Sequence, residues 1–289
     1  MNDTKEKLIK VFEDTEKLCS SNPILQSSIK ESINNTSLYK ENEYPVITER
    51  FDMLGKVSVN KFKTIETAYF IRKHNPSSKI GILNFASATN VGGGVRKGSS
   101  AQEESICRVS TLYPVLNTEN NMKNYYQYHR DRRDVRYTDR IIYTPNIKVF
   151  KTDEEVPSLL PENKWIDIDV ITCAAPNLNK NPNNEMNPGN DRPIRLSEKE
   201  LYKIHLQRAK HILTVASYNE VDFLILGAFG CGAFQNNPYT VAEAYRDAIN
   251  DSSKTDFYKQ FKEIIFSIYS PKYRNKGLDN FKAFKEVLG

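Results

Sequence analysis

The sequence is poor in the features that mark disulfide, zinc and membrane proteins. Its 289 residues include four cysteines, which form no C-x-x-C pair and have no histidine at zinc-finger spacing: Cys19, Cys107, Cys173 and Cys231. Neither a disulfide framework nor a zinc knuckle is expected, and we expect the thiols to be reduced. No stretch approaches the roughly 20 consecutive apolar residues that span a bilayer. The sequence therefore argues against an integral membrane protein.

The start of the chain also lacks a targeting signal. Residues 1–10 are polar and of mixed charge, without the apolar core and small-residue cleavage site of a secretory signal. We therefore expect an intracellular, cytoplasmic protein, with a nuclear location left open.

The overall composition is that of a globular chain. Hydrophobic residues make up 39%, aromatic residues 11% and charged residues 27%, which is unlike intrinsically disordered or collagen-like chains. The length predicts one large domain or two small ones. A net charge of +5 would suit a polyanionic partner, but 36 acidic residues accompany the 41 basic ones. Charge alone therefore identifies no partner.

Hydrophobic periodicity divides the chain into a helical start and an alternating remainder. Residues 3–34 have helical spacing with a break at 20–23, which predicts two helices. After the polar residues 40–43, short apolar runs of strand length alternate with helical segments. The expected strands lie at 46–47, 79–85, 141–150, 166–175, 221–228 and 264–269, and the expected helices at 64–74, 103–113, 197–218, 238–250 and 278–288.

This alternation predicts an α/β fold in which helices cover both faces of a largely buried sheet. Residues 1–43 are expected to form an N-terminal helical extension that packs on the core, and residues 44–289 the catalytic domain. Residues 176–193 are dense in Asn, Pro and Gly, which predicts a long loop of the kind that is often functional.

Three consecutive glycines, Gly92, Gly93 and Gly94, follow the expected strand at 79–85. Consecutive glycines are needed where the backbone takes positive φ or approaches another group closely. A ligand is one candidate for that group, and a plain flexible loop is the alternative.

A second glycine-rich turn follows the expected strand at 221–228. Residues 227–232 have the order G-x-x-G-x-G, and Asn237-Pro238 then opens a helix. Strand, glycine turn and helix together present free backbone N–H groups to phosphate. A Rossmann site and a P-loop are poor fits, because the glycine order is reversed and no Gly-Lys-Ser/Thr follows. Two such turns suggest a diphosphate held between facing loops, with Phe234 either beside the ligand or in the core.

An adjacent carboxyl pair, Glu103 and Glu104, opens the helix expected after the triple glycine. Acidic residues in a first turn complement the helix dipole, but this pair must also lie near whatever the glycines approach. Neighbouring helical residues point about 100° apart, so separate roles are expected. Glycosidic cleavage needs an acid for the leaving oxygen and then a base for water. A general acid needs a raised pKa, so burial or a diphosphate must overcome the helix dipole.

These residues resemble a known family. Gly92-Gly93-Gly94, seven intervening residues and Gln102-Glu103-Glu104 match the G-G-G-x(6–8)-Q-E-E signature of poly(ADP-ribose) glycohydrolases. Asn84-Phe85-Ala86 before the signature and residues 105–113 after it resemble the bacterial or microbial type. The resemblance spans nearly the whole chain, since it extends to residues 11–15, 141–150, 174–177 and 227–234.

The resemblance implies a macrodomain-like three-layer sandwich with a central mixed sheet. It also implies hydrolysis of the ribose–ribose O-glycosidic bonds of poly(ADP-ribose), in an exo mode from the chain terminus, with release of ADP-ribose. By resemblance, Glu104 is the general acid and base, and Glu103 holds a ribose hydroxyl. The other implied substrate contacts are Gln102, which orients the loop, Asn90 and the triple glycine at the distal ribose, and Gly230, Cys231, Gly232, Ala233 and Phe234 at the diphosphate.

The same resemblance sets the expected partners. These are poly(ADP-ribose) or ADP-ribosylated protein as substrate and ADP-ribose as product, without a membrane, for a monomer that reverses ADP-ribosylation, including in the DNA damage response. No metal and no other cofactor is required. Arg96 and Lys97 put two positive charges in the catalytic loop, which either favour a polyanion or are solvated. No motif assigns the adenine contacts.

Three alternative functions stay open. A mono-ADP-ribosyl hydrolase would act on protein or nucleic-acid acceptors. A non-catalytic ADP-ribose-binding macrodomain is disfavoured, because binding a dianionic diphosphate gains nothing from two nearby carboxylates. A nucleic-acid-binding structural protein would account for the charge but leaves both glycine turns unexplained.

Other polar features have structural interpretations. Cys107 and Cys231 lie within the two motif segments, but no motif links a histidine to either thiol, so packing roles are expected. His205 and His211 are interpreted as surface or structural residues. Residues 128–137 alternate charge and aromatic character, which indicates a solvated helix end or loop rather than a poly(ADP-ribose) contact.

Overall fold

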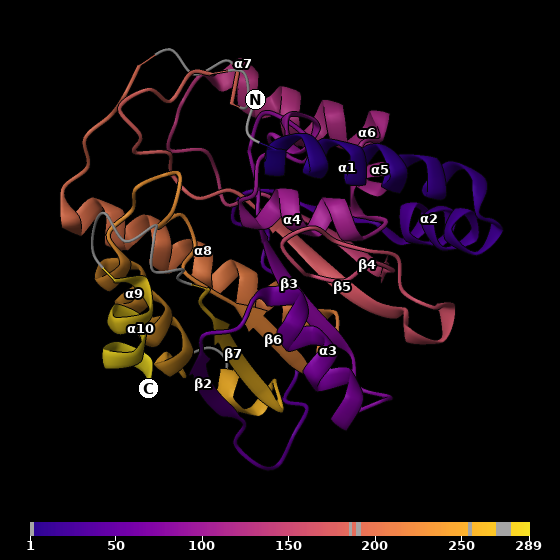
Figure 1. Cartoon of the computed structure of the whole chain (residues 1–289). Coiled ribbons are helices and arrows are strands. Elements are labelled where there is room, and N and C mark those ends of the chain that lie inside the picture. The colour runs from indigo at the N-terminus through magenta and orange to yellow at the C-terminus, as the bar shows by residue number, and fades with distance from the viewer. Residues whose placement is uncertain (1–2, 185–186, 189–191, 254–255, 270–278) are drawn as a thin grey trace.

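The computed structural model describes residues 3–184, 187–188, 192–253, 256–269 and 279–289. A seven-stranded mixed sheet lies between two layers of helices (Figure 1). The predicted α/β sandwich is therefore confirmed. Within the described residues, no helix has both the length and the apolar character needed to cross a membrane.

The strand order of the sheet is β1-β4-β5-β3-β6-β7-β2. The strands from β5 to β2 run parallel, and β4 and β1 extend the β5 edge with antiparallel pairings. The carboxyl ends of the parallel strands therefore meet at one edge, which is where open α/β sheets bind ligands. The strand bounds are Ser37–Tyr39 (β1), Lys56–Asn60 (β2), Ile80–Phe85 (β3), Ile141–Val149 (β4), Ile166–Cys173 (β5), Phe223–Leu226 (β6) and Glu263–Ser267 (β7).

The helices divide between the two faces of the sheet. One face carries α8, α9 and α10, and the other carries α1 to α5 (Figure 1). The bounds on the first face are Glu198–Tyr218 (α8), Pro238–Asn250 (α9) and Asn280–Leu288 (α10), and on the second Asp3–Ser21 (α1), Pro23–Asn35 (α2), Thr64–His74 (α3), Gln102–Val109 (α4) and Leu112–Leu116 (α5).

Each face of the sheet has its own hydrophobic core, because successive strand residues point to opposite sides. Ile82 and Ile225 pack with α3 and α4 in one core, whereas Leu83 and Leu224 pack with α8 and α9 in the other. Burial on both faces explains why the parallel strands are apolar runs rather than alternating patterns.

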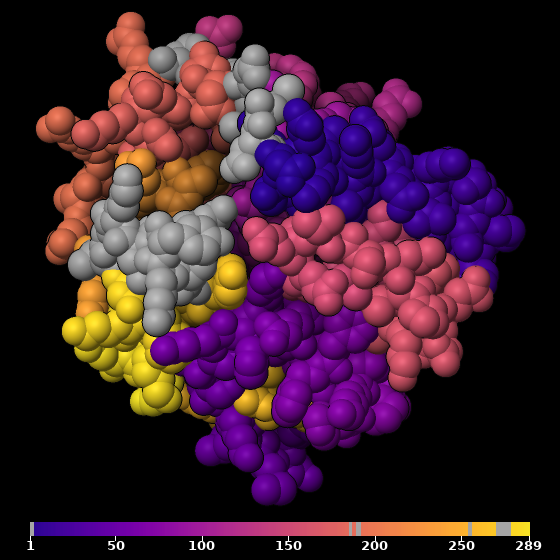
Figure 2. Space-filling model, viewed as in Figure 1, coloured from indigo at the N-terminus to yellow at the C-terminus, as the bar shows by residue number. Residues whose placement is uncertain are grey.

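The N-terminal helices pack directly on this core. Phe12 of α1 lies edge-to-face with Tyr113 at a ring distance of 5.1 Å. The buried Lys151 ammonium forms an ion pair of 2.8 Å with Asp14 and donates to Thr15 Oγ1 at 2.7 Å. In Figure 2, N-terminal atoms (indigo) lie against the segment around residues 150–165 (pink). That residues 1–43 form a unit of their own stays a prediction. The contacts above attach the helices of this segment to the core.

Several local expectations were wrong. Val46 and Ile47 form no strand; Val46 is 89% exposed in an irregular segment. Strands β1 and β2 were not anticipated, because one has three residues and the other is rich in polar side chains. The helix expected at 103–113 ends at Val109, where Ser110 takes extended backbone (φ −143°). Further helical turns follow at Glu119–Asn121 (α6), Met122–Gln127 (η2, a π-helix) and Tyr128–Arg132 (α7).

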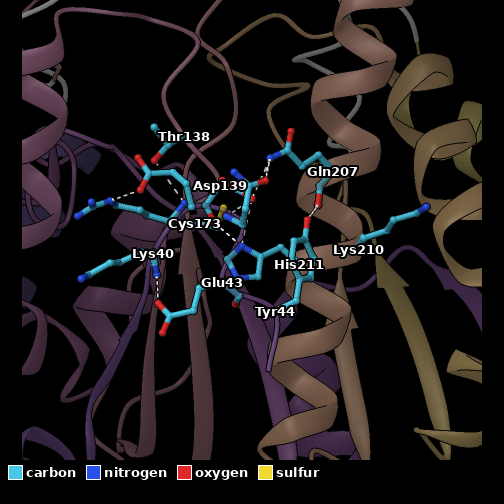
Figure 3. Close-up of polar contacts among 12 residues, drawn as sticks. Lys40, Glu43, Tyr44, Thr138, Asp139, Cys173, Gln207, Lys210 and His211 are labelled. Atoms are coloured by element: carbon cyan, nitrogen blue, oxygen red, sulfur yellow. Dashed lines mark hydrogen bonds and ion pairs between the residues drawn. The ribbon is translucent and has the colours of Figure 1, made fainter. Parts of the chain in front are cut away.

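A buried polar cluster fastens the segment after β1 to α8 (Figure 3). His211 of α8 is fully buried, and its Nδ1 and Nε2 lie 2.7 Å and 3.0 Å from the carbonyl oxygens of Asp139 and Glu43. Each ring nitrogen thus faces a carbonyl oxygen, which only accepts hydrogen bonds. The Asp139 carboxyl lies 3.3 Å from Nδ1. Burial alone would raise the pKa of Asp139, but hydrogen bonds from His211 and Gln207 and the His211 charge lower it.

The variant Asp139→Asn is expected to lower the free energy of unfolding by about 3 kcal/mol, because it removes a buried carboxylate that His211 and Gln207 stabilise. Urea unfolding at pH 7 measures this loss. In the wild type the same stabilisation is present above pH 3.8, the ordinary pKa of an Asp, and is lost as the pH falls through the lower folded value. Asp251→Asn, at the more exposed pair with Lys210, is the control, and an equal loss there would contradict the prediction.

Candidate active site

The loops after the parallel strands line a large cleft of about 1720 Å³. Its walls include Phe85 at the end of β3, Ser267 at the end of β7, the turn after β6, and Gln102 at the start of α4. Small-molecule pockets usually measure roughly 300–1,000 Å³, so the cleft has room for a large, extended ligand. Glu103 and Glu104 follow the cleft residue Gln102 in α4 and are buried, with exposed fractions of 3% and 7%.

The triple glycine wraps around the carboxyl pair. Gly92 and Gly93 have φ values of +65° and +55°. A Cβ added to Gly93 would lie 2.7 Å from Glu104 Oε1 and 3.2 Å from Glu103 Oε2. Asn90 fixes the turn, because its side-chain amide donates to the carbonyl of Gly93 at 2.5 Å. The prediction of positive φ and close approach is confirmed, and the group approached is the carboxyl pair itself.

Glu103 is held on both of its carboxyl oxygens. Oε2 accepts the backbone N–H of Ser87 at 2.8 Å, and Oε1 lies 3.4 Å from Nδ2 of Asn84. Asn84 is a fully buried β3 residue and also donates to Thr172 on the neighbouring strand β5 at 3.2 Å. The Glu103 carboxyl is therefore anchored to the sheet and cannot turn freely.

Glu104 is held on one side only. Its Oε1 accepts the backbone N–H of Gly94 at 2.9 Å, and within the described chain its Oε2 receives no hydrogen bond from another residue. Gln102 sets the position of both glutamates, since its side chain accepts from Phe85 N at 2.9 Å and donates to Leu83 O at 2.7 Å. The start of α4 is thereby tied to the end of β3, with one oxygen of Glu104 left available for proton transfer.

The carboxyl pair retains protons to higher pH than isolated glutamates. Burial, the main cause, and the neighbouring Glu104 raise the pKa of Glu103 well above its ordinary value. Burial also raises the pKa of Glu104, although the Gly94 hydrogen bond and the Arg108 charge act in the opposite direction. The helix dipole would lower the pKa of these carboxyls, but desolvation has the larger effect, so both pKa values are raised.

The second glycine turn presents unpaired backbone donors. Gly230 takes positive φ (+77°), and a Cβ there would lie 2.5 Å from the Cβ of Ala175. In the described structure the N–H groups of four turn residues make no hydrogen bond: Gly230, Gly232, Ala233 and Phe234. Successive free N–H groups in a turn can form an anion-binding nest.

Phe234 and Cys231 complete this turn. Phe234 lines the cleft and also lies 6.2 Å from the ring of the buried Tyr137. Its place beside a bound ligand stays a prediction. Burial raises the pKa of the Cys231 thiol, and likewise that of Cys107. A thiol with a raised pKa is a poor nucleophile, which supports packing roles for both.

Arg96, one of the two positive charges beside the triple glycine, has defined partners on α1. Arg96, in the turn Val95–Lys97 (η1), forms an ion pair with Glu16 of α1 and lies over the rings of Phe12 and Tyr113, at 5.5 Å and 5.1 Å from their centroids. Arg96 therefore clamps the catalytic loop to α1. Its side chain is 57% exposed, so Arg96 is both paired and solvated.

The charged and aromatic residues at 128–137 form internal contacts. Arg130 donates to Thr89 O at 2.7 Å, and Arg140 stacks on Tyr128 at 3.4 Å. The segment begins with the short helix α7, in agreement with the helix-end interpretation. A separate cavity of about 190 Å³ nearby is lined by Glu41, Asp139 and Arg208. Its small volume and its two carboxyls disfavour a diphosphate there.

Sequence reasoning missed three contributions to the site. The Ser87 backbone N–H binds Glu103, and Asn236 and His205 lie directly behind the second turn. Every residue except proline has a backbone N–H, so the composition cannot indicate which one binds a carboxylate. The G-x-G-x-F-x-N pattern over residues 230–236 was a usable signal for Asn236, but nothing in the sequence links it to a histidine 31 residues earlier.

The fold and these residues define a macrodomain-like α/β protein with a buried glycosidase-type carboxyl pair. The model of the family described as microbial-type PARG, catalytic domain, where PARG is poly(ADP-ribose) glycohydrolase, matches residues 6–152, just over half of the chain. The chain therefore belongs to the microbial-type poly(ADP-ribose) glycohydrolase family. It is an enzyme that hydrolyses poly(ADP-ribose).

Solved structures agree with this assignment. A poly(ADP-ribose) glycohydrolase from Thermomonospora curvata superposes with a TM-score of 0.82 at 24% identity, covering 98% of this chain and 99% of that one. The enzyme from Deinococcus radiodurans in complex with ADP-ribose gives a TM-score of 0.70 at 26% identity, covering 90% and 96%. No curated protein sequence is significantly similar to the chain.

Proposed function

We propose that Glu104 is the general acid and base of poly(ADP-ribose) hydrolysis and that Glu103 holds a hydroxyl of the distal ribose. The observation that supports these roles is the different anchoring of the two carboxyls. Glu103 is fixed on both oxygens, whereas Glu104 keeps one oxygen free of bonds to other residues. A fixed acceptor suits binding, and a carboxyl with an available oxygen suits proton transfer.

The reaction uses one carboxyl twice. Protonated Glu104 gives its proton to the oxygen of the leaving ribose while the C–O bond to the distal ribose breaks, which leaves an oxocarbenium-like centre. Water then attacks this centre and gives a proton to the Glu104 carboxylate, so the acid is restored. Asn90 and the triple glycine lie against this ribose, and the free N–H groups of residues 230–234 take the diphosphate.

The proposed cleavage mode is exo, with the terminal ADP-ribose unit in the cleft. This rests on the resemblance to the bacterial enzymes, and the Deinococcus radiodurans relative was solved with ADP-ribose. The test is incubation with automodified poly(ADP-ribose) polymerase, followed by separation of the products by length. Exo cleavage releases ADP-ribose alone from the first time points. Early oligomers would contradict it, and release only from mono-ADP-ribosylated acceptors would favour the mono-ADP-ribosyl hydrolase.

The activity is expected to decrease as the pH rises, because Glu104 acts as an acid. Burial raises its pKa above the ordinary 4.5, and above the raised value kcat/KM should fall about tenfold per pH unit. The folded state also keeps a proton that the unfolded chain releases, so the free energy of unfolding falls as the pH rises from 4.5 through the folded value. A pH profile of kcat/KM, with circular dichroism as the folding control, measures this. A profile without this decrease would contradict the acid role.

A further inference from the structure

The second glycine turn is fastened from behind by one buried side chain. Asn236 is 3% exposed, and its Nδ2 lies within hydrogen-bonding distance of three carbonyl oxygens: Pro176 at 2.8 Å, Gly230 at 3.0 Å and Phe234 at 3.1 Å. Its backbone N–H also donates to Gly230 O at 3.1 Å. Asn236 therefore closes the turn at both ends and ties it to the segment after β5.

A histidine of α8 sets the orientation of this amide. His205 Nε2 lies 2.8 Å from Asn236 Oδ1, and an amide oxygen only accepts, so Nε2 is the protonated nitrogen. Burial lowers the pKa of His205 to about 3, so the ring is neutral and adds no charge behind the turn. The ring also packs edge-to-face on Phe229 at 5.8 Å, which holds it in place.

The geometry of the turn depends on this arrangement. A Cβ at Gly230 would lie 2.9 Å from Asn236 Nδ2, so the amide occupies the space that a side chain would fill. The backbone carbonyls of Gly230 and Phe234 face inward to Asn236, and the N–H groups of residues 230 and 232–234 make no protein hydrogen bonds in the described structure. Donors that are already oriented bind an anion without the cost of ordering a loop.

We propose that Asn236 and His205 are positioning residues for the diphosphate of the substrate. Asn236 holds the turn in its anion-binding shape, and His205 fixes the amide of Asn236. Asn236 borders the cleft, but its amide is engaged by the turn and by His205, so both residues act through the backbone donors of the turn. The proposal rests on the placement of the diphosphate at residues 230–234 proposed above.

The decisive variant is Asn236→Asp, which keeps the size but replaces both N–H donors with a carboxylate facing three carbonyl oxygens. Isothermal titration with ADP-ribose is expected to give a Kd raised about tenfold or more, the equivalent of one or two lost hydrogen bonds. Asn237→Asp is the charge-matched control, because aspartate caps α9 as well as asparagine does. It adds the same charge one residue away and is expected to have a smaller effect.

The histidine is tested by a pair of substitutions. His205→Leu removes the donor and leaves Asn236 Oδ1 buried without a partner, so ADP-ribose affinity should fall about threefold to tenfold. His205→Gln can place an amide N–H near the position of Nε2 and should recover most of the affinity. In both series KM for poly(ADP-ribose) should change with Kd and kcat much less, because the turn is proposed to bind the diphosphate and takes no part in the proton transfers.

Adenosine lacks the diphosphate, so its binding distinguishes a loss of diphosphate positioning from general damage to the binding site. Asn236→Asp should weaken ADP-ribose but leave adenosine binding near that of the wild type. Equal losses for both ligands, equal Kd values for Asn236→Asp and Asn237→Asp, or unchanged affinity in His205→Leu would overturn the proposal. Because these measurements report binding, they still test the positioning roles if Glu104 is not the acid. A wild type that does not bind ADP-ribose would overturn the diphosphate placement and this proposal together.

Discussion

Glu104→Gln is expected to lower kcat on poly(ADP-ribose) by about 10³-fold, within the range for loss of a general acid–base group. Glutamine has the same size and its oxygen can still accept the Gly94 N–H, so the loop should keep its shape. ADP-ribose should therefore bind to the variant about as well as to the wild type. Single-turnover release of ADP-ribose and titration calorimetry measure the two effects separately.

Glu103→Gln is the matched comparison, because it makes the same chemical change at the adjacent residue. The proposed contact of Glu103 with a ribose hydroxyl predicts a larger effect on KM and a smaller one on kcat. If Glu103→Gln were the variant with the larger loss of kcat, the two roles would be exchanged. If Glu104→Gln released ADP-ribose as fast as the wild type, the proposed mechanism would be wrong.

Gly93→Ala is expected to reduce kcat/KM by about 100-fold or more. The new methyl group would lie 2.7 Å from Glu104 Oε1 and 3.2 Å from Glu103 Oε2, so both carboxyls must move, and displacements of about 1 Å can cost that factor. The left-handed backbone (φ +55°) adds a stability cost of about 1 kcal/mol for alanine. Steady-state kinetics and thermal unfolding measure the two effects.

The stability control for this variant is Gly232→Ala, since no atom lies within 4 Å of a Cβ at Gly232 and its φ is not positive. Its melting temperature should match that of the wild type, whereas Gly93→Ala should melt lower. A Gly93→Ala enzyme with full activity would show that the carboxyl pair tolerates displacement, which contradicts the packing described above.

The sequence predicted the parts of the site that depend on local pattern. The buried strands ending at Phe85 and Leu226 are apolar on both faces, and the glycines after them mark positions with positive φ, so both turns could be placed. Helix α9 was predicted with its observed bounds, because Asn237 caps it and Pro238 occupies its first turn. The pairing of Glu103 and Glu104 with the triple glycine was also visible, since the two motifs are near in sequence.

Features that depend on tertiary packing were missed. Strand β2 has the sequence KVSVN and pairs with β7 some 200 residues away, so its conformation comes from its neighbour rather than its propensity. The π-helix at Met122–Gln127 buries Tyr125 and Tyr126 side by side, which a regular helical period does not predict. His205 and His211 were interpreted as surface or structural residues; both are buried, and only their partners from distant segments explain why.

The hydrogen bond between Gly94 and Glu104 makes the ionisation of Glu104, the proposed acid, observable from the backbone. The Gly94 amide donates to Oε1 at 2.9 Å, and a donor facing a carboxylate experiences a stronger field than one facing a neutral acid. The ¹⁵N and ¹H chemical shifts of this one glycine should therefore follow the proton on Glu104. The enzyme thus contains its own spectroscopic indicator, which can be titrated without substrate and compared directly with the pH profile of catalysis.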